Sequence, residues 1–322
     1  MSLKNFFVGE LKKFFEPPRY LFKIFFLNLF GFQVIRYLLF NFVFKIKSFF
    51  FNKKKLNEKM QVASQELDSN GIALINNFLD DKILDQINNQ INNLEKKDVF
   101  NKDLLGNKGV IHGRIDKKLF INDNYEKQSL ENIIKKTGLI NLISNVLLKN
   151  ISEVPEITYQ KVYSNNNFKD ENDINSEFHS DRFYNCIKVF LYLNENKFEN
   201  GSYEYIKGSH VRNFKRVIFE YFFSIFSCIK ISNKLLNKFG FQFINNRLTI
   251  TSKSIDKHFN NSLIKCNGLQ NTLVISNNKG LHRRGKFLPN QTRIQIRMNF
   301  YEFQVPFYKR FLKNIIIKNY YK

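Results

Sequence analysis

The spacing of apolar residues changes character along the chain, and this change predicts two kinds of structure. Residues 72–75 form a short apolar run directly after the turn-forming residues 68–71, which indicates a strand. Apolar residues then recur at helical spacing over 79–94 and again over 130–148. The first of these two segments also carries its acidic residues early, as helices do. The N-terminal half is therefore predicted to be largely helical.

Beyond residue 150 the pattern becomes one of short runs rich in β-branched and aromatic residues. Asn, Gly, Pro and Asp separate these runs, which favours strands joined by turns. The predicted strands cover residues 157–163, 186–193, 203–206, 272–276 and 292–303. Helices followed by strands predict an α+β fold with a mainly β core, a sandwich or barrel flanked by helices. Residues 217–229 are apolar all round, so we expect a helical insertion at about 211–255.

The first 55 residues form a separate basic and apolar segment, predicted to be a helical N-terminal extension to a domain spanning 56–322. Glu10 and Glu16 argue against a secretory signal. Within residues 20–51 the longest uncharged run is 24–35, or 12 residues, whereas a membrane span needs about 20. Three interpretations stay open: an amphipathic helix on a membrane surface, a helix packed on the body of the following domain, and a span whose charged ends snorkel.

Charge is concentrated in three apolar segments. The formal net charge is +23, of which residues 1–55 carry +9, residues 211–253 carry +7 and residues 303–322 carry +5. Basic residues among aromatic and aliphatic ones fit a membrane surface better than nucleic acid, so no nucleic-acid partner is expected. The three cysteines lack CxxC spacing, which excludes a disulfide framework and a cysteine zinc site. We expect a cytoplasmic protein, with peripheral attachment to the inner face of the membrane as an option.

Candidate chemistry begins at His179 and Asp181. Residues i and i+2 of a strand point to the same face, so this imidazole and this carboxylate can reach one metal ion. A distant histidine would complete a facial triad, and His282 follows the predicted strand 272–276. Such a triad leaves coordination positions open, as non-haem Fe(II) oxygenases require.

An arginine eleven residues after His282 extends the pattern. Arg293 stands at the head of an alternating strand, where it can form a bidentate ion pair with the distal carboxylate of a keto-diacid. The other end of the diacid would chelate the iron. Arg297 lies on the same strand face and is the alternative anchor.

Over roughly residues 65–305 the chain resembles the phytanoyl-CoA dioxygenase family of Fe(II)/2-oxoglutarate oxygenases. The likeness rests on the His-x-Asp motif, on the segment from Asn200-Gly201 to Gly208-Ser209-His210, and on the distal histidine with its following arginine. The resemblance implies a double-stranded β-helix (jelly-roll) core. It also implies Fe(II), 2-oxoglutarate as co-substrate, O₂, and hydroxylation of an unactivated C–H bond with release of succinate and CO₂. The substrate that names the family does not follow, because its members act on many compounds.

The resemblance also suggests roles for particular residues. His179, Asp181 and His282 resemble the metal ligands, and Arg293 resembles the 2-oxoglutarate anchor. Asn290 and Thr292 fall where the family often has small polar residues near the co-substrate. The other residues considered are His210, interpreted as structural, His112, placed in a polar surface loop, and Gln160, Tyr163 and Lys188, which are either contacts or framework.

Two other functions compete with a dioxygenase that hydroxylates a small-molecule, lipid or glycan substrate. One is a metal-binding jelly-roll protein without oxygenase activity. The other is a nucleic-acid-modifying dioxygenase, prompted by the charge of +23. The nearly neutral part of the chain contains the candidate site, which weakens the second alternative.

Overall fold

The computed structural model describes residues 25–302 except for short internal gaps. The gaps are residues 106–107, 118–119, 124–125, 165–173, 212, 230–231, 245–246, 252 and 256–261. The basic segment 303–322 and the first 24 residues of the predicted extension lie outside the described residues.

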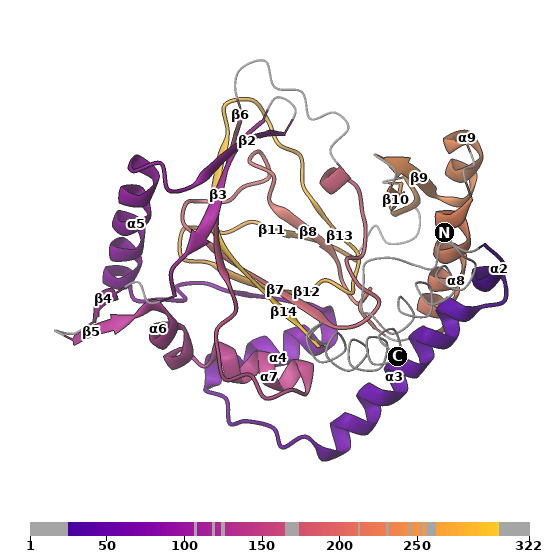
Figure 1. The fold of residues 1–322 in the computed structure, drawn as a ribbon, viewed down its shortest axis with the longest axis horizontal. Helices are drawn as coiled ribbons and strands as arrows, with labels where there is room; N and C mark the ends of the chain where they lie inside the picture. Colours follow the sequence, from indigo (N-terminus) through magenta and orange to yellow (C-terminus); the bar gives the residue numbers. More distant parts are fainter. Residues whose placement is uncertain are drawn as a thin grey trace, which may run out of the picture.

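The centre of the fold is a seven-stranded antiparallel sheet. Its strands, in spatial order, are β1 (Ile72–Ile75), β12 (Leu273–Asn277), β7 (Cys186–Tyr192), β14 (Thr292–Tyr301), β6 (Ile157–Ser164), β3 (Lys108–Ile115) and β2 (Asn101–Leu105). A three-stranded sheet faces it (Figure 1), with the order β11 (Leu263–Cys266), β8 (Tyr203–Ile206) and β13 (His282–Arg284). A backbone bridge from His179 to His282 adds a fourth segment at the edge of this smaller sheet.

The alternation of side chains along β7 shows how the two sheets make a jelly roll. Ile187, Val189 and Leu191 point to the outer face of the large sheet and join the main hydrophobic core. Phe190 and Tyr192 point the other way and pack with residues of the smaller sheet. The strands therefore enclose an interior between two facing antiparallel sheets, which confirms the predicted jelly roll with a mainly β core.

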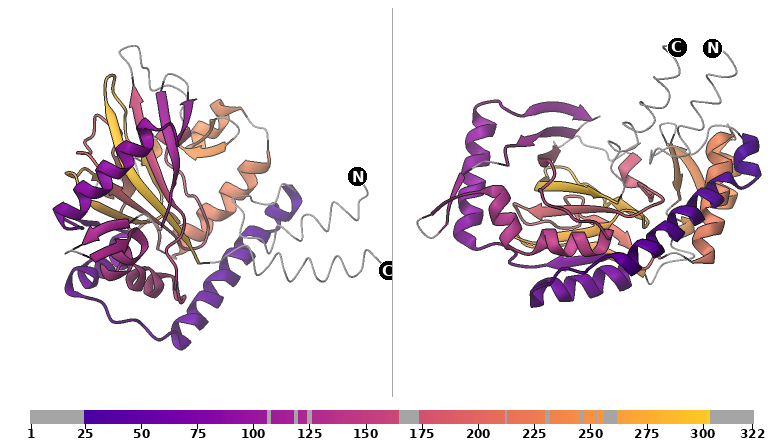
Figure 2. Two further views of the ribbon diagram at one scale, coloured as in Figure 1. Left: turned by 60° about the vertical axis from the view of Figure 1, so that its left-hand side comes forward. Right: turned by 60° about the horizontal axis from the view of Figure 1, so that its bottom comes forward.

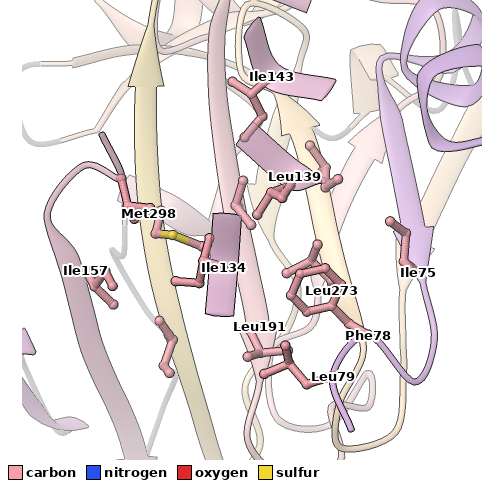
Figure 3. Packing of buried hydrophobic residues seen from close by; sticks show 14 of the residues in the cluster. Ile75, Phe78, Leu79, Ile134, Leu139, Ile143, Ile157, Leu191, Leu273 and Met298 are labelled. Atoms are coloured by element: carbon pink, nitrogen blue, oxygen red, sulfur yellow. The ribbon is translucent and has the colours of Figure 1, made fainter. Parts of the chain in front are cut away.

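Helices cover the outer face of the large sheet. They are α4 (Glu58–Asn70), α5 (Asp81–Lys96), α6 (Leu130–Lys136) and α7 (Leu139–Leu147). Figure 3 shows the resulting core, in which Ile134 and Leu139 of the helices pack against Leu191, Leu273 and Met298 of the strands. This dry layer supports the sheet from behind, so that the opposite face is available for polar side chains.

The structure corrects three details of the predicted elements. The single helix expected over 130–148 is two helices, because Gly138 between them has a left-handed φ of 85°. His112 was placed in a polar loop but lies on β3, opposite Gln160 of β6. The insertion at 211–255 is helical only at first, with α8 (Phe214–Cys228), α9 (Asn233–Leu236) and the 3₁₀ turn Asn237–Phe239.

A β-hairpin completes the insertion, formed by β9 (Phe241–Ile244) and β10 (Arg247–Ile250). A second small hairpin, β4 (Phe120–Asp123) with β5 (Glu126–Ser129), lies next to α5 (Figure 1). Each of these hairpins joins two adjacent strands of only four residues, and runs this short carry little periodic signal.

The described part of the N-terminal extension consists of α2 (Phe25–Leu29) and α3 (Phe32–Phe50). Both contact α8, and α3 runs along one edge of the molecule (Figure 2). Among the helices formed by the described residues, none has the length and apolar character needed to cross a membrane.

Candidate metal centre

Backbone pairing between distant segments brings two histidines together. His179 and His282 form a reciprocal antiparallel pair, in which each backbone N–H donates to the other's carbonyl oxygen at 3.0 Å. Directly opposite residues in such a pair point to the same face of the sheet. The two imidazole rings consequently lie with their centroids 4.5 Å apart, and both face the interior.

Asp181 joins the two histidines because it is two residues beyond His179. Its backbone N–H donates to the carbonyl of Asn278 at 3.0 Å, which ties Asp181 to the segment directly after β12. One carboxylate oxygen, Oδ1, is 3.8 Å from Nε2 of His179, and Oδ2 is 3.5 Å from Nε2 of His282. One ligand atom from each residue can be chosen so that all three lie within 4.8 Å of one another. The structure thus brings the three predicted ligands to one point.

A hydrogen bond from Nδ1, the ring nitrogen that faces away from the carboxylate, orients each imidazole for metal binding. Nδ1 of His179 donates to the carbonyl of Glu177 at 2.7 Å, and Nδ1 of His282 donates to the carbonyl of Gly280 at 3.0 Å. A carbonyl can only accept, so the proton must lie on Nδ1 in each ring. In the neutral tautomer that this contact selects, Nε2 carries the lone pair and faces the carboxylate. This arrangement is typical of metal-ligating histidines, whose other ring nitrogen is held by a backbone acceptor.

The carboxylate of Asp181 is kept ionised by positive charge. Burial alone would raise its pKa, but the charge of Lys188, with smaller contributions from the neighbouring His282 and His179, outweighs burial and holds the pKa of Asp181 well below its usual range. Nζ of Lys188, on the inner face of β7, lies 2.5 Å from Oδ2. Of the two roles that the sequence allows for Lys188, contact or framework, the structure shows a contact with the site.

Asn278, which sequence analysis did not identify, bridges two of the ligand atoms. Its Nδ2 donates to Oδ2 of Asp181 and to Nε2 of His282, both at 2.9 Å. Its Oδ1 accepts from the hydroxyls of Tyr203 and Ser276 at 3.1 and 3.0 Å. The only sequence signal was its position two residues beyond Ser276 on the inner face of β12.

This donor set fits a first-row divalent ion such as Fe(II). Two neutral imidazole nitrogens and one carboxylate converge, and that combination is the facial triad of non-haem iron sites. In this structure Lys188 and Asn278 donate hydrogen bonds to ligand atoms of the triad, namely Oδ2 of Asp181 and Nε2 of His282. A cation in their place would satisfy the same atoms, so the residues present are compatible with the metal.

Cationic side chains line the inner face of β14. Arg293, Gln295 and Arg297 alternate with Ile294 and Ile296, which pack against the helices. Arg293 is buried, and its guanidinium donates to the carbonyl of Gly201.

Register separates the two arginines. Asn299 of β14 pairs with Lys188 of β7 and so marks the level of the metal site. Arg297 is two residues from Asn299, or about 7 Å along the strand, and Arg293 is six residues from Asn299, or about 20 Å along the strand. Both face the interior, as predicted, but at different depths.

Of the other two residues that the resemblance suggested for the co-substrate, Thr292 is the first residue of β14 and Asn290 lies in the turn before it. The carbonyl of Thr292 accepts from the side-chain amides of Asn194 and Asn200 at 2.9 and 3.2 Å. Asn290 is exposed, with a left-handed φ of 56°. Turn structure explains these two observations without a ligand.

The remaining candidates have structural surroundings. His210 donates from Nε2 to the carbonyl of Asp68 at 3.2 Å, which ties the segment after β8 to the end of α4 and agrees with a structural role. Gln160 accepts from Gln295 at 2.8 Å across the inner face of the large sheet. Tyr163 packs its ring over Gly109 of the neighbouring strand, where a Cβ atom would clash.

A cavity of about 410 Å³ lies on the other side of the smaller sheet. Its lining includes Leu281 and Ile250, which neighbour the metal-site segments but point away from the interior, together with Phe219 and Phe241 of the insertion. Because neighbouring residues on a strand face opposite sides, this cavity is separated from His282 by the sheet itself.

Comparison with known proteins gives a likeness in structure only. The sequence matches no family model and no curated protein. Solved structures that are similar include EctD from S. alaskensis in its apoform, at 10% identity and a TM-score of 0.45, covering 77% of this chain and 79% of that one. HygX from Streptomyces hygroscopicus, with nickel and 2-oxoglutarate bound, shows 13% identity and a TM-score of 0.41 over 78% and 91% of the two chains.

A third similar structure is the non-haem alpha-ketoglutarate-dependent epimerase SnoN from nogalamycin biosynthesis. It shows 8% identity and a TM-score of 0.43, over 74% of this chain and 81% of that one. At these values the likeness assigns no function to this chain. Membership of the phytanoyl-CoA dioxygenase family stays a prediction.

Proposed function

We propose that this protein is an Fe(II)/2-oxoglutarate-dependent dioxygenase that hydroxylates an unactivated C–H bond of a small-molecule, lipid or glycan substrate. The observation that carries the proposal is the convergence of His179, Asp181 and His282 inside the jelly roll, with both imidazoles presenting Nε2. Burial of all three side chains, at 3–9% exposure, excludes bulk water from the ligand atoms.

Each residue of the triad has a defined task. His179 and His282 would hold the metal through Nε2, and Asp181 would hold it through a carboxylate oxygen. Fe(II) held by these residues would activate O₂, which is the oxidant both for the decarboxylation of 2-oxoglutarate and for the hydroxylation. A triad that includes a carboxylate would leave coordination positions open for 2-oxoglutarate and O₂, which favours hydroxylation.

The positive interior of the barrel suits a dicarboxylate. We assign the distal carboxylate of 2-oxoglutarate to Arg293, whose planar guanidinium can pair with it through two hydrogen bonds. Arg297 is the alternative anchor, because it faces the same interior at a different depth. Lys188, which contacts Asp181, adds a positive charge beside the site.

The test is release of succinate by the full-length protein with Fe(II), 2-oxoglutarate and O₂, across panels of lipids, sugars and amino acids. We expect stimulated release with one panel and none from the Asp181→Ala variant. Asp85→Ala, at an exposed position of α5, is the matched control and should keep full release. Tight Fe(II) binding without succinate from any panel would instead support the metal-binding protein without oxygenase activity.

A further inference from the structure

Helix α3 has the reverse of the polarity expected for a helix on a water-soluble protein. Its buried side chains are Gln33, Arg36 and Tyr37, so the face toward the protein body is mainly polar. Its exposed side chains are large and apolar: Phe32, Ile35, Leu38, Leu39, Phe42, Val43, Ile46, Phe49 and Phe50. A surface helix normally buries its apolar stripe and exposes its polar one.

Helix α8, almost two hundred residues later in the chain, shows the same reversal. It buries Arg216, Glu220 and Ser224, and it exposes Phe214, Ile218 and Phe222. The short helix α2 continues the apolar surface with Phe26, Leu29 and Phe30. Two segments that are distant in sequence therefore contribute to one pattern.

The polar side chains hold the three helices together. Glu220 forms an ion pair with Arg216 at 2.7 Å and accepts from Nε2 of Gln33 at 3.2 Å. Asn28 of α2 donates to Sγ of Cys228 at 2.9 Å, and the hydroxyl of Tyr221 donates to the carbonyl of Leu29 at 3.0 Å. These contacts fix the orientation in which the apolar sides face outward.

The guanidinium of Arg36 lies between the same acid and an aromatic ring. Its Cζ is 4.1 Å from the ring centroid of Phe183, and Glu220 acts on its charge from the other helix. Burial outweighs that acid and lowers the pKa of Arg36 to about 10, which leaves the side chain charged at neutral pH. Polar groups that satisfy each other inside a bundle, with apolar groups outside, are the arrangement that a lipid environment favours.

We propose that the exposed faces of α2, α3 and α8, here called the α3–α8 face, dock on the surface of an anionic lipid bilayer. The face consists of the exposed apolar residues given above for these three helices. Figure 2 shows α3 lying along one edge of the molecule beside α8, where such a face can approach a plane. Interfacial helices of this kind bury an apolar face in the headgroup boundary without crossing the membrane.

Charge at the end of α3 supports an anionic surface. Lys45 and Lys47 lie among the exposed apolar residues of its last turns, and Lys53 and Lys55 follow directly and are exposed. Burial lowers the pKa of Lys149, and Lys47 lowers it further, which indicates a positive field at this end of the helix. Clustered lysines beside an interfacial helix attract anionic headgroups.

A second copy of the chain is the other occupant that the pattern could fit. Phe32, Ile35, Leu39, Phe42 and Ile46 follow the alternating three- and four-residue spacing of a coiled-coil seam. The exposed surface is wider than a seam, however, because Leu38, Val43 and Phe50 flank it and α2 and α8 extend it. A broad apolar surface with lysines fits a bilayer better than a narrow helical contact.

The inner side of α3 reaches the segments that carry the metal ligands. Tyr37 packs with Phe183 and Tyr184, which follow Asp181 by two and three residues. The ring of Tyr37 also lies 5.9 Å from Nζ of Lys279, next to Asn278. Docking would therefore hold the metal centre close to the bilayer, which favours a membrane amphiphile as substrate. That consequence rests on the proposed function, whereas docking itself does not.

The experiment measures flotation of the full-length protein with vesicles. The vesicles are phosphatidylcholine alone, or phosphatidylcholine mixed with phosphatidylglycerol. We expect binding to the mixed vesicles and a loss of about a hundredfold or more in the triple variant Phe42→Ser/Ile46→Ser/Phe49→Ser.

The matched control is Val62→Ser/Val99→Ser/Leu269→Ser, which removes three equally exposed apolar side chains from other faces and should bind normally. All substituted residues are exposed, so each variant should keep the melting temperature of the parent.

A second pair of variants tests the charge. Lys45→Gln/Lys47→Gln should weaken binding to the mixed vesicles by up to about thirtyfold, because each lysine near an anionic surface contributes about 1 kcal/mol. Lys96→Gln/Lys97→Gln, at the exposed end of α5, is the control and should bind normally.

Absence of binding by the parent, or equal binding by the Phe42/Ile46/Phe49 variant, would overturn the proposal. A dimer in sedimentation velocity that this variant dissociates, without vesicle binding, would overturn it in favour of a second copy. Each of these results is independent of succinate release.

Discussion

Charged side chains are buried at several places among the described residues, and two of these places, the metal centre and the contact between α3 and α8, differ in how the charges are arranged. In the metal centre, His179, Asp181 and His282 point their lone pairs at one another. In the helix contact, Arg216 and Arg36 share the acid Glu220, so opposite charges face each other.

Burial of charge therefore does not by itself mark a functional site. Converging lone pairs repel one another unless a donor or a cation lies between them. In the metal centre this role falls to the hydrogen bonds from Lys188 and Asn278, or to a bound metal ion. Paired charges such as Arg216 and Glu220 are complete and hold two helices in place. We therefore expect substitutions in the first region to change chemistry and substitutions in the second to change stability.

The largest effect is expected for Asp181→Ala. Loss of the carboxylate leaves two imidazoles, which cannot form the triad, so Fe(II) binding and 2-oxoglutarate turnover should be abolished. Anaerobic Fe(II) titration and succinate release measure the two losses, and circular dichroism checks that the fold is kept. Full turnover in this variant would show that Asp181 is not a ligand.

Arg293→Ala should raise the KM for 2-oxoglutarate strongly, because the lost charge-assisted pairing contributes about 2–4 kcal/mol to the binding free energy. Steady-state kinetics at saturating Fe(II) measures this, with Arg297→Ala in parallel. If the KM is unchanged in Arg293→Ala and raised in Arg297→Ala, the anchor lies at the other depth on β14.

Glu220→Gln tests the second region. It leaves Arg216 and Arg36 buried without their acid, so we expect the free energy of unfolding to fall by about 2–3 kcal/mol. Urea denaturation measures the change. Glu195→Gln removes the exposed acid that pairs with Lys197, and as a control it should cost less than about 1 kcal/mol. An equal loss in both variants would mean that the helix contact is not a distinct structural region.

Glu95 offers a smaller, pH-dependent test at a partly exposed pair outside both regions. It accepts from Tyr159 at 2.8 Å and from Lys161 at 2.7 Å. Burial would raise its pKa, but these two hydrogen bonds outweigh burial and lower it. A lowered pKa means that the carboxylate stabilises the fold at neutral pH and that this contribution is lost as the pH falls through its folded pKa.

We therefore expect Glu95→Gln to lower the free energy of unfolding by about 1–2 kcal/mol at neutral pH. The difference in free energy of unfolding between variant and parent should disappear as the pH drops below about 4. Urea titrations at the two pH values measure it. A gap that widens on acidification would contradict the sign of the pKa shift.

The strands that build the site were largely predictable because their periodicity is local. The predicted runs 157–163, 186–193 and 203–206 lie within one residue of β6, β7 and β8. The hairpin of β2 and β3 was not predicted, because its stability comes from pairing with β6 rather than from its own sequence. The division of residues 130–148 depends on one glycine, Gly138, within an otherwise continuous helical pattern.

By itself the amino-acid sequence determined which side chains share a face, and with that the pairing of His179 with Asp181 and the alternation along β14. Which faces meet follows from the folded structure alone. It placed His282 opposite His179, brought Asn278 and Lys188 onto the ligand atoms, and turned the polar side of α3 inward. The physical reason is that periodicity reports the geometry of one element, whereas contacts between elements depend on backbone pairing and packing over long stretches of chain.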